Sequence, residues 1–146
     1  MSKRRDRHAR GIRGPLARAN EVTGAPVPLR KKPPRLEVFR RAVQTSVDQI
    51  ATACPRALTG MAIGYEDVPG IVPSWQDRAP LARATPARPG EPGHVVLYRR
   101  PIEFRAPTPA ELRRLVHHTL VEQLSATTGI PCDELDPHFD PDDWDD

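Results

Sequence analysis

Two residues near the end of a predicted helix have side chains that could bind a metal ion. His118 and Glu122 are four residues apart, which places an imidazole and a carboxylate one turn apart on the same flank of a helix. Cys132 follows Gly129 closely, so its thiol is a candidate third ligand for a metal such as zinc. The alternative interpretation is a surface i, i+4 pair that contributes only a few tenths of a kcal/mol. His117 lies about 140° around the helix from Glu122, which prevents the two from easily sharing a metal.

The helix that carries this pair has clear signals at both ends. Thr108 is a favourable N-cap, Pro109 suits the first helical position, and Glu111 completes a capping box. Gly129 is the expected C-cap, so we predict a helix that ends at about Thr128.

The apolar pattern of this helix predicts which side faces the core. The residues that cluster on the predicted inner face, or directly beside it, are Leu112, Leu115, Val116, Thr119, Leu120, Gln123, Ala126 and Thr127. Gln123 is therefore expected to point toward the core, where an amide without partners costs about 1–3 kcal/mol.

An earlier helix is predicted after Pro33 and Pro34 and ends at Pro55. Its apolar residues are three or four positions apart: Leu36, Phe39, Val43, Val47, Ile50 and Cys54. Because Cys54 continues this stripe, we interpret it as a small buried side chain rather than as a reactive thiol.

Alternating or continuous apolar residues predict strands at 61–66 and 95–99. A short edge strand is predicted at 81–85, inside a proline-rich connection, and Ile102 and Phe104 are interpreted as an irregular extension of the strand at 95–99. This order of elements predicts an α+β fold, a short mixed sheet with helices packed on one face.

Charge divides the chain into three predicted parts. Residues 1–35 contain eleven Lys or Arg and only two acidic residues, whereas residues 133–146 contain eight acidic residues and no Lys or Arg. We therefore predict a disordered basic arm over 1–32, a folded domain over 33–135 and an acidic tail over 136–146.

Both ends suggest partners. Five arginines of the arm are candidates for contact with nucleic-acid phosphates: Arg4, Arg5, Arg7, Arg10 and Arg13. The arm has no interleaved aromatic residue to stack on bases, which favours a solubilising segment instead. Phe139 and Trp144 could dock on a protein partner or on the arm, but their acidic neighbours favour a solvated tail.

The cellular compartment follows from what the sequence lacks. Two cysteines are too few for a disulfide framework. No apolar stretch approaches the roughly 20 residues that span a bilayer, and the N-terminus has no apolar stretch typical of a secretory signal. We therefore expect a cytoplasmic protein without a membrane partner.

Three segments of the chain resemble the minimal zincin-like metallopeptidases of bacteria, especially their actinobacterial branch. They are residues 5–16, residues 95–103 and residues 118–135. The resemblance implies a zincin-like fold for residues 33–135. In active members it also implies the pattern H-E-x-x-H-x-x-G-x-x-D, in which two histidines and an aspartate bind zinc and the glutamate is the general base.

Gly129 matches the glycine of this pattern, but the functional positions are replaced. The resemblance places Glu122 and Ala126 at the first two zinc ligands, Gln123 at the general base and Cys132 at the third ligand. Alanine cannot bind zinc, and glutamine cannot accept a proton from zinc-bound water. The motif, Glu122-Gln123-Leu124-Ser125-Ala126, is therefore degenerate. No residue is assigned as catalytic, and no cofactor is expected.

These observations favour a metallopeptidase-family protein that is inactive or non-hydrolytic and that binds a peptide without cutting it. A second hypothesis is an active metalloenzyme with a zinc site rebuilt from His118, Glu122 and Cys132. A third is a nucleic-acid-associated protein that acts through the basic arm.

Overall fold

The computed structural model describes residues 18–19, 26–27, 33–70 and 79–144. Contacts divide the chain into two units, residues 1–34 and residues 35–146. In the first unit, β1 (Arg18–Ala19) pairs antiparallel with β2 (Pro26–Val27). The other described elements belong to the second unit, which carries the candidate site.

The first long helix, α1 (Arg35–Ala53), forms where the sequence predicts it. Its buried residues are three or four positions apart: Phe39, Ala42, Ser46 and Ile50. The predicted stripe is therefore shifted, because Val43 and Val47 are half-buried at the margin of the core and do not lie at the centre of the contact. Cys54 is buried in the core, as predicted, and Pro55 begins the 3-10 turn η1 (Pro55–Leu58).

Three strands form the sheet of the second unit: β3 (Met61–Glu66), β4 (Ala82–Thr85) and β5 (Gly93–Tyr98). β5 lies in the centre, parallel to β3 and antiparallel to β4. The predicted mixed sheet and the predicted edge strand at 81–85 are therefore confirmed.

The strand at 95–99 does not continue irregularly through Ile102 and Phe104, as predicted. The chain instead turns into a short helix, α2 (Arg99–Arg105). Pro101 is tolerated there because the first-turn N–H groups of a helix have no partner within the helix. Ile102 is fully buried and Phe104 is 89% exposed, so the helix gives these two apolar residues opposite environments.

The second long helix, α3 (Pro109–Thr128), has the predicted ends. The Thr108 hydroxyl accepts the backbone N–H of Glu111, and the Glu111 carboxylate accepts the backbone N–H of Thr108. Gly129 ends the helix with a φ of 75°, a conformation that glycine adopts without strain. The short helix α4 (Cys132–Leu135) and the 3-10 turn η2 (Pro141–Trp144) follow.

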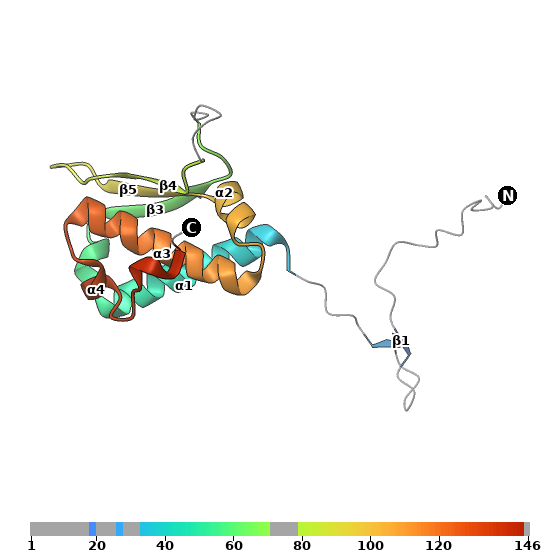
Figure 1. Cartoon of the computed structure of the whole chain (residues 1–146). Helices are drawn as coiled ribbons and strands as arrows, with labels where there is room; N and C mark the ends of the chain where they lie inside the picture. Colours follow the sequence, from blue (N-terminus) through green and yellow to red (C-terminus); the bar gives the residue numbers. More distant parts are fainter. Residues whose placement is uncertain (1–17, 20–25, 28–32, 71–78, 145–146) are drawn as a thin grey trace. The chain divides into compact units, whose positions relative to one another are not determined.

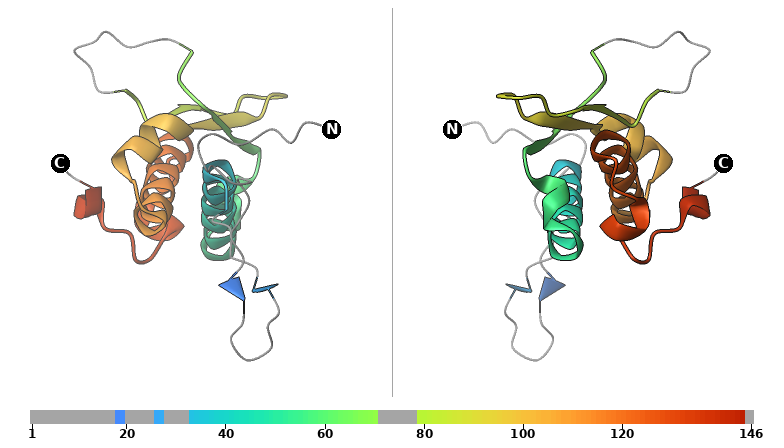
Figure 2. Two further views of the ribbon diagram at one scale, coloured as in Figure 1. Left: turned by 90° about the vertical axis from the view of Figure 1, so that its right-hand side faces the viewer. Right: turned by 90° about the vertical axis from the view of Figure 1, so that its left-hand side faces the viewer.

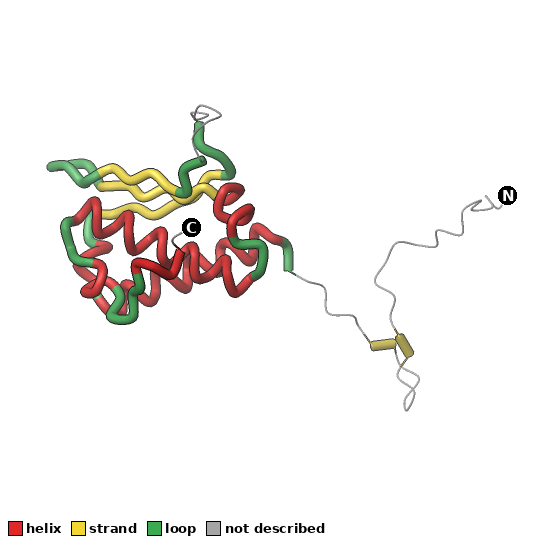
Figure 3. The backbone as a smooth tube through the Cα atoms, viewed as in Figure 1, coloured by secondary structure: helices red, strands yellow, loops and turns green. Residues whose placement is uncertain are grey.

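Figures 1 and 2 show α1 and α3 side by side beneath one face of the sheet. Figure 3, which is coloured by secondary structure, shows one layer of strands and one layer of helices in the second unit, with α2 at one end. The α+β class, with helices on one face of a short mixed sheet, is confirmed. No helix in the described ranges is long and apolar enough to cross a membrane.

Candidate functional site

The buried surface of α3 differs from the predicted one. Its buried residues are Leu112, Leu115, Val116, His118, Thr119, Leu120, Val121 and Leu124. Gln123 is only half-buried and Ala126 is exposed, so the predicted core position of Gln123 is wrong. Because α3 packs against α1 as well as β4 and β5, burial extends around the middle of the helix and one apolar arc does not describe it.

Three positions of the motif described above lie in the C-terminal half of α3, and all three are exposed or partly exposed to solvent. Glu122 has a side chain that is 51% exposed, Gln123 is half-buried and Ala126 is exposed. Leu124 is the buried residue of this stretch and anchors it to the core. A ligand could therefore reach these positions, but among them only the Glu122 carboxylate could bind a metal.

His118 does contact Glu122, as the spacing predicts. Its Nε2 lies 3.3 Å from Oε1 of Glu122. The imidazole is not a free surface group, however, because it is 8% exposed and stacks on Phe139 with ring centroids 4.8 Å apart. Phe139 thereby covers one face of the imidazole, while the Nε2 atom of His118 faces Glu122.

Cys132 is the first residue of α4 and is half-buried. Within the ranges that the structure describes, no three His, Cys, Asp or Glu side chains form a group that could hold a metal ion. The structure therefore keeps the pair of His118 and Glu122 but does not complete it with Cys132.

The neighbouring histidine, His117, has a different environment that sequence analysis missed. Its Nδ1 lies 2.8 Å from Oγ of Ser46 on α1, and its Nε2 lies 2.9 Å from Oδ2 of Asp136, directly after α4. One imidazole thus connects two helices and the start of the acidic tail. The sequence signal for this contact is weak because 71 and 19 residues separate His117 from its two partners.

These three residue types also occur in hydrolase triads, but this arrangement cannot act as one. Ser46 is 1% exposed and lies in the middle of α1, so its hydroxyl does not reach a substrate. His117 contacts Ser46 through one ring nitrogen and Asp136 through the other, as in a triad, but a nucleophile that no substrate can reach cannot react. We therefore interpret the contact of Ser46, His117 and Asp136 as structural.

Asp136 is held as a carboxylate in this contact. Burial of the group opposes ionisation, but hydrogen bonds from the His138 backbone N–H and from His117 outweigh it and lower the pKa of Asp136. The His138 N–H lies 2.9 Å from Oδ1, so each carboxylate oxygen has its own partner.

The acidic tail is less solvated than predicted. Phe139 packs on His118, and the Trp144 ring lies 5.6 Å from the guanidinium carbon of Arg114. Arg114 also pairs with Asp143. Both aromatic side chains pack against the core of their own unit, which explains why the described part of the tail lies against α3 while most of its carboxylates stay exposed.

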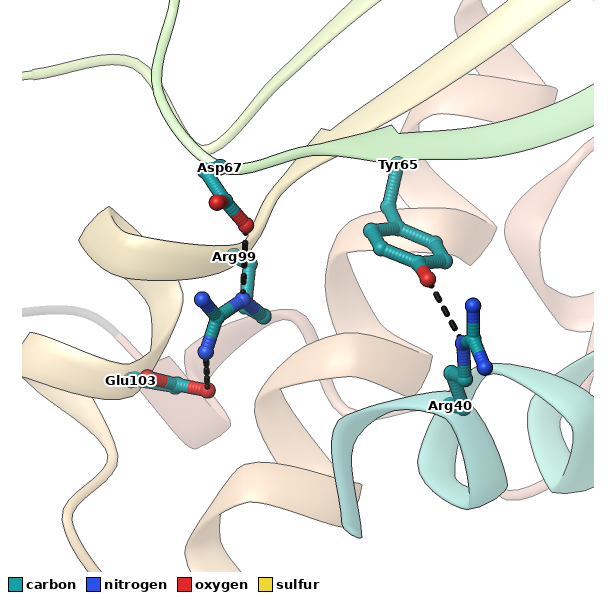
Figure 4. Close-up of polar contacts among 5 residues, drawn as sticks. All are labelled: Arg40, Tyr65, Asp67, Arg99 and Glu103. Atoms are coloured by element: carbon teal, nitrogen blue, oxygen red, sulfur yellow. Dashed lines mark hydrogen bonds and ion pairs between the residues drawn. The ribbon is translucent and has the colours of Figure 1, made fainter. Parts of the chain in front are cut away.

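A second polar cluster lies where α2 meets the chain just after β3 (Figure 4). Arg99 lies between Asp67 and Glu103, with its Nε 2.8 Å from Oδ1 of Asp67 and its Nη1 3.0 Å from Oε1 of Glu103. The hydrogen bond from Arg99 lowers the pKa of Asp67. Arg40 on α1 donates to the Tyr65 hydroxyl on β3 at 2.6 Å. These contacts join α2 to the end of β3 and α1 to the sheet.

Comparison with known families assigns the chain. A family model for zincin-like metallopeptidases matches residues 47–139, more than half of the chain. The chain belongs to the zincin-like metallopeptidase family. The matched region extends from the second half of α1 to Phe139, so it includes the sheet and all of α3. A search of curated proteins gave no match.

The zincin-like family implies zinc, but the donors on α3 do not fit it. A catalytic zinc site needs three protein ligands, and within the described part of α3 only the pair of His118 and Glu122 brings two possible donors together. The described residues also contain no three-donor group elsewhere. The arginines predicted to contact nucleic acid, Arg4 to Arg13, lie outside the described residues.

Proposed function

We propose that this zincin-like protein does not hydrolyse peptides with zinc and that it binds an extended peptide without cutting it. The observation that carries the proposal is the replaced stretch from Glu122 to Ala126, which lies on an accessible part of α3. We also propose, from the resemblance of residues 5–16, 95–103 and 118–135, that the chain belongs to the actinobacterial branch of the family.

The replacements remove both functions that zinc-dependent hydrolysis requires. Ala126 has no atom that binds a metal, so at most Glu122 remains of the two helical ligands. Gln123 has an amide where the reaction needs a carboxylate to accept a proton from the attacking water. No other described group of side chains supplies the missing donors.

The sheet supports the peptide-binding part of the proposal. β4 pairs with β5 on one side and, among the described strands, has no partner on the other. Such an edge exposes backbone N–H and C=O groups to which an extended peptide can add as a further strand. β4 also packs against α3, the helix that carries the replaced positions.

Metal analysis of untagged protein, together with a peptidase assay, tests this proposal. We expect well under one zinc per chain after purification from zinc-containing medium. We also expect no chelator-sensitive hydrolysis of a quenched fluorescent peptide library. One zinc per chain together with chelator-sensitive hydrolysis would overturn the proposal.

The rebuilt metal site is the competing enzymatic hypothesis, and it is disfavoured because the described residues bring no third donor to the pair of His118 and Glu122. We expect His118→Ala to leave the metal content unchanged. A fall from one metal per chain to none in that variant would instead support a site built from His118, Glu122 and Cys132.

A further inference from the structure

A second surface of the protein, away from the replaced positions, exposes large apolar side chains. Phe104 on α2 is 89% exposed and Val68, just after β3, is 57% exposed. Both line an open groove of about 790 Å³, together with Pro69, Pro101 and Pro107. An exposed apolar surface with this much aromatic and proline character is typical of sites that bind another molecule.

The walls of this groove are held in place by contacts within the domain. The Arg99 side chain ties α2 to Asp67, and the backbone N–H of Arg100 donates to the carbonyl of Asp67 at 3.0 Å. On the other wall, the Arg105 guanidinium donates to the carbonyl of Ala79 at 3.3 Å. A partner would therefore meet a groove that is already formed, which reduces the entropic cost of binding.

The charges at the groove favour an acidic partner. Arg35 and Arg100 line it and are exposed, and among the described residues neither has a carboxylate within ion-pair distance. Glu103, the acidic residue of the lining, is already paired with Arg99. The groove thus combines an apolar lining with two guanidinium groups that form no ion pair among the described residues, although Arg100 also acts electrostatically on the Asp67 carboxylate that Arg99 binds. Aromatic residues and arginine are enriched at protein interfaces.

The groove lies at the other end of α3 from the replaced zinc-ligand positions. α2 lies beside the start of α3, whereas α4 follows its end (Figure 1). Since a helix rises about 1.5 Å per residue, 20 residues of α3 extend roughly 30 Å. A ligand in the groove would therefore not need the residues around Glu122.

We propose that this groove, lined by Val68, Arg100 and Phe104, docks a short acidic segment of a partner protein that carries an apolar anchor residue. The anchor packs on Phe104 and the prolines, and the carboxylates of the partner pair with Arg35 and Arg100. The acidic tail of the same chain is not the occupant, because Phe139 and Trp144 pack against their own core.

Fluorescence polarisation with three labelled decapeptides tests the proposal on the full chain. The first has a central Leu–Phe pair between runs of glutamate, the second has Ser–Ser in place of the pair, and the third has lysines in place of the glutamates. We expect the first to bind best, with an affinity that falls as salt rises. Equal binding of all three, or no binding at millimolar peptide, would overturn the proposal.

Two variants assign the binding to the groove. Phe104→Ser and Arg100→Glu should each weaken binding of the first peptide about tenfold or more. Arg113→Glu is the matched control, since it makes the same charge change at an exposed residue of α3 that lies outside the groove. Equal losses in Arg100→Glu and Arg113→Glu would show a general charge effect and overturn the site. If Phe104→Ser does not fold, Val68→Ser replaces it.

The experiments also distinguish two other occupants of the groove, a second copy of the chain and the segment 71–78. Concentration-dependent self-association that Phe104→Ser abolishes would assign the groove to a second copy and overturn the proposal. A tenfold gain in peptide affinity after residues 71–78 are replaced by a glycine–serine linker would assign it to that segment, with the same consequence.

Discussion

In the degenerate motif that we propose, Gln123 differs from the glutamate of an active zincin by one group, an amide nitrogen in place of a carboxylate oxygen. The difference removes a proton acceptor, and a positioned general base contributes typically about 10²–10⁴-fold to a rate. Ala126 removes a donor atom entirely. Because the proposed losses are separate and lie on adjacent turns of α3, we expect that neither reversion alone restores zinc-dependent hydrolysis.

At the same scale, His117 has a structural role that can be measured. We expect His117→Ala to lower the free energy of unfolding by about 1–3 kcal/mol, because it leaves the buried Ser46 hydroxyl and the Oδ2 atom of Asp136 without their partner. Urea denaturation measures the change. His138→Ala is the control, since that side chain is exposed, and an equal loss in both variants would contradict the assigned role.

Asp136 gives a prediction for pH dependence. Its pKa is lowered in the folded state, so its contribution to stability is present above the unfolded pKa of about 3.9 and is lost as pH falls through the folded pKa. The variant Asp136→Asn should therefore have a lower free energy of unfolding than the natural protein at pH 7. This gap between the two free energies should narrow below about pH 4. Denaturation at a series of pH values measures the gap. A gap that stays constant down to pH 2.5 would contradict the prediction.

At the scale of elements, the helix ends were predictable and the buried faces were not. The capping box of Thr108 and Glu111 is a local signal, and the structure forms it as predicted. The environment of Gln123 depends on which elements cover α3, and this information is not local. α2 was missed because Pro101 ends a strand as readily as it enters the first turn of a helix.

The contact of His117 with Asp136 was missed for a related reason. Between them the chain ends α3 at Gly129, turns and forms α4, and residue spacing does not specify where that turn brings the chain. Sequence analysis could therefore identify the family and the ends of α3, but it could not identify the side chains that pack around this helix.

A substitution of Arg99 tests how α2 is attached to the sheet. We expect Arg99→Ala to reduce the free energy of unfolding by about 1–3 kcal/mol, mainly because Glu103, only 11% exposed, loses its partner. Asp67 is 60% exposed and contributes little to this loss. Thermal denaturation measures the effect, and Arg100→Ala, at the adjacent exposed arginine, should leave stability nearly unchanged. A similar loss in both would contradict a specific role for Arg99.

At the scale of the whole molecule, the basic arm stays a prediction from sequence. If it binds nucleic acid, full-length protein should be retained on heparin or DNA resin at low salt and released as salt rises. A chain that begins at Pro33 should lose that retention and keep its thermal unfolding midpoint. Equal retention of both chains would contradict a role for the arm.

We propose that the protein retains the zincin-like fold and has lost the zinc site of the family through replaced residues. Zinc titration by calorimetry measures this most directly, with the natural protein beside the variant Glu122→His, Gln123→Glu, Ala126→His and Cys132→Asp, which restores the family pattern. We predict that the restored variant binds one zinc per chain and that the natural protein binds none with comparable affinity. Tight, stoichiometric binding by the natural protein would contradict the account.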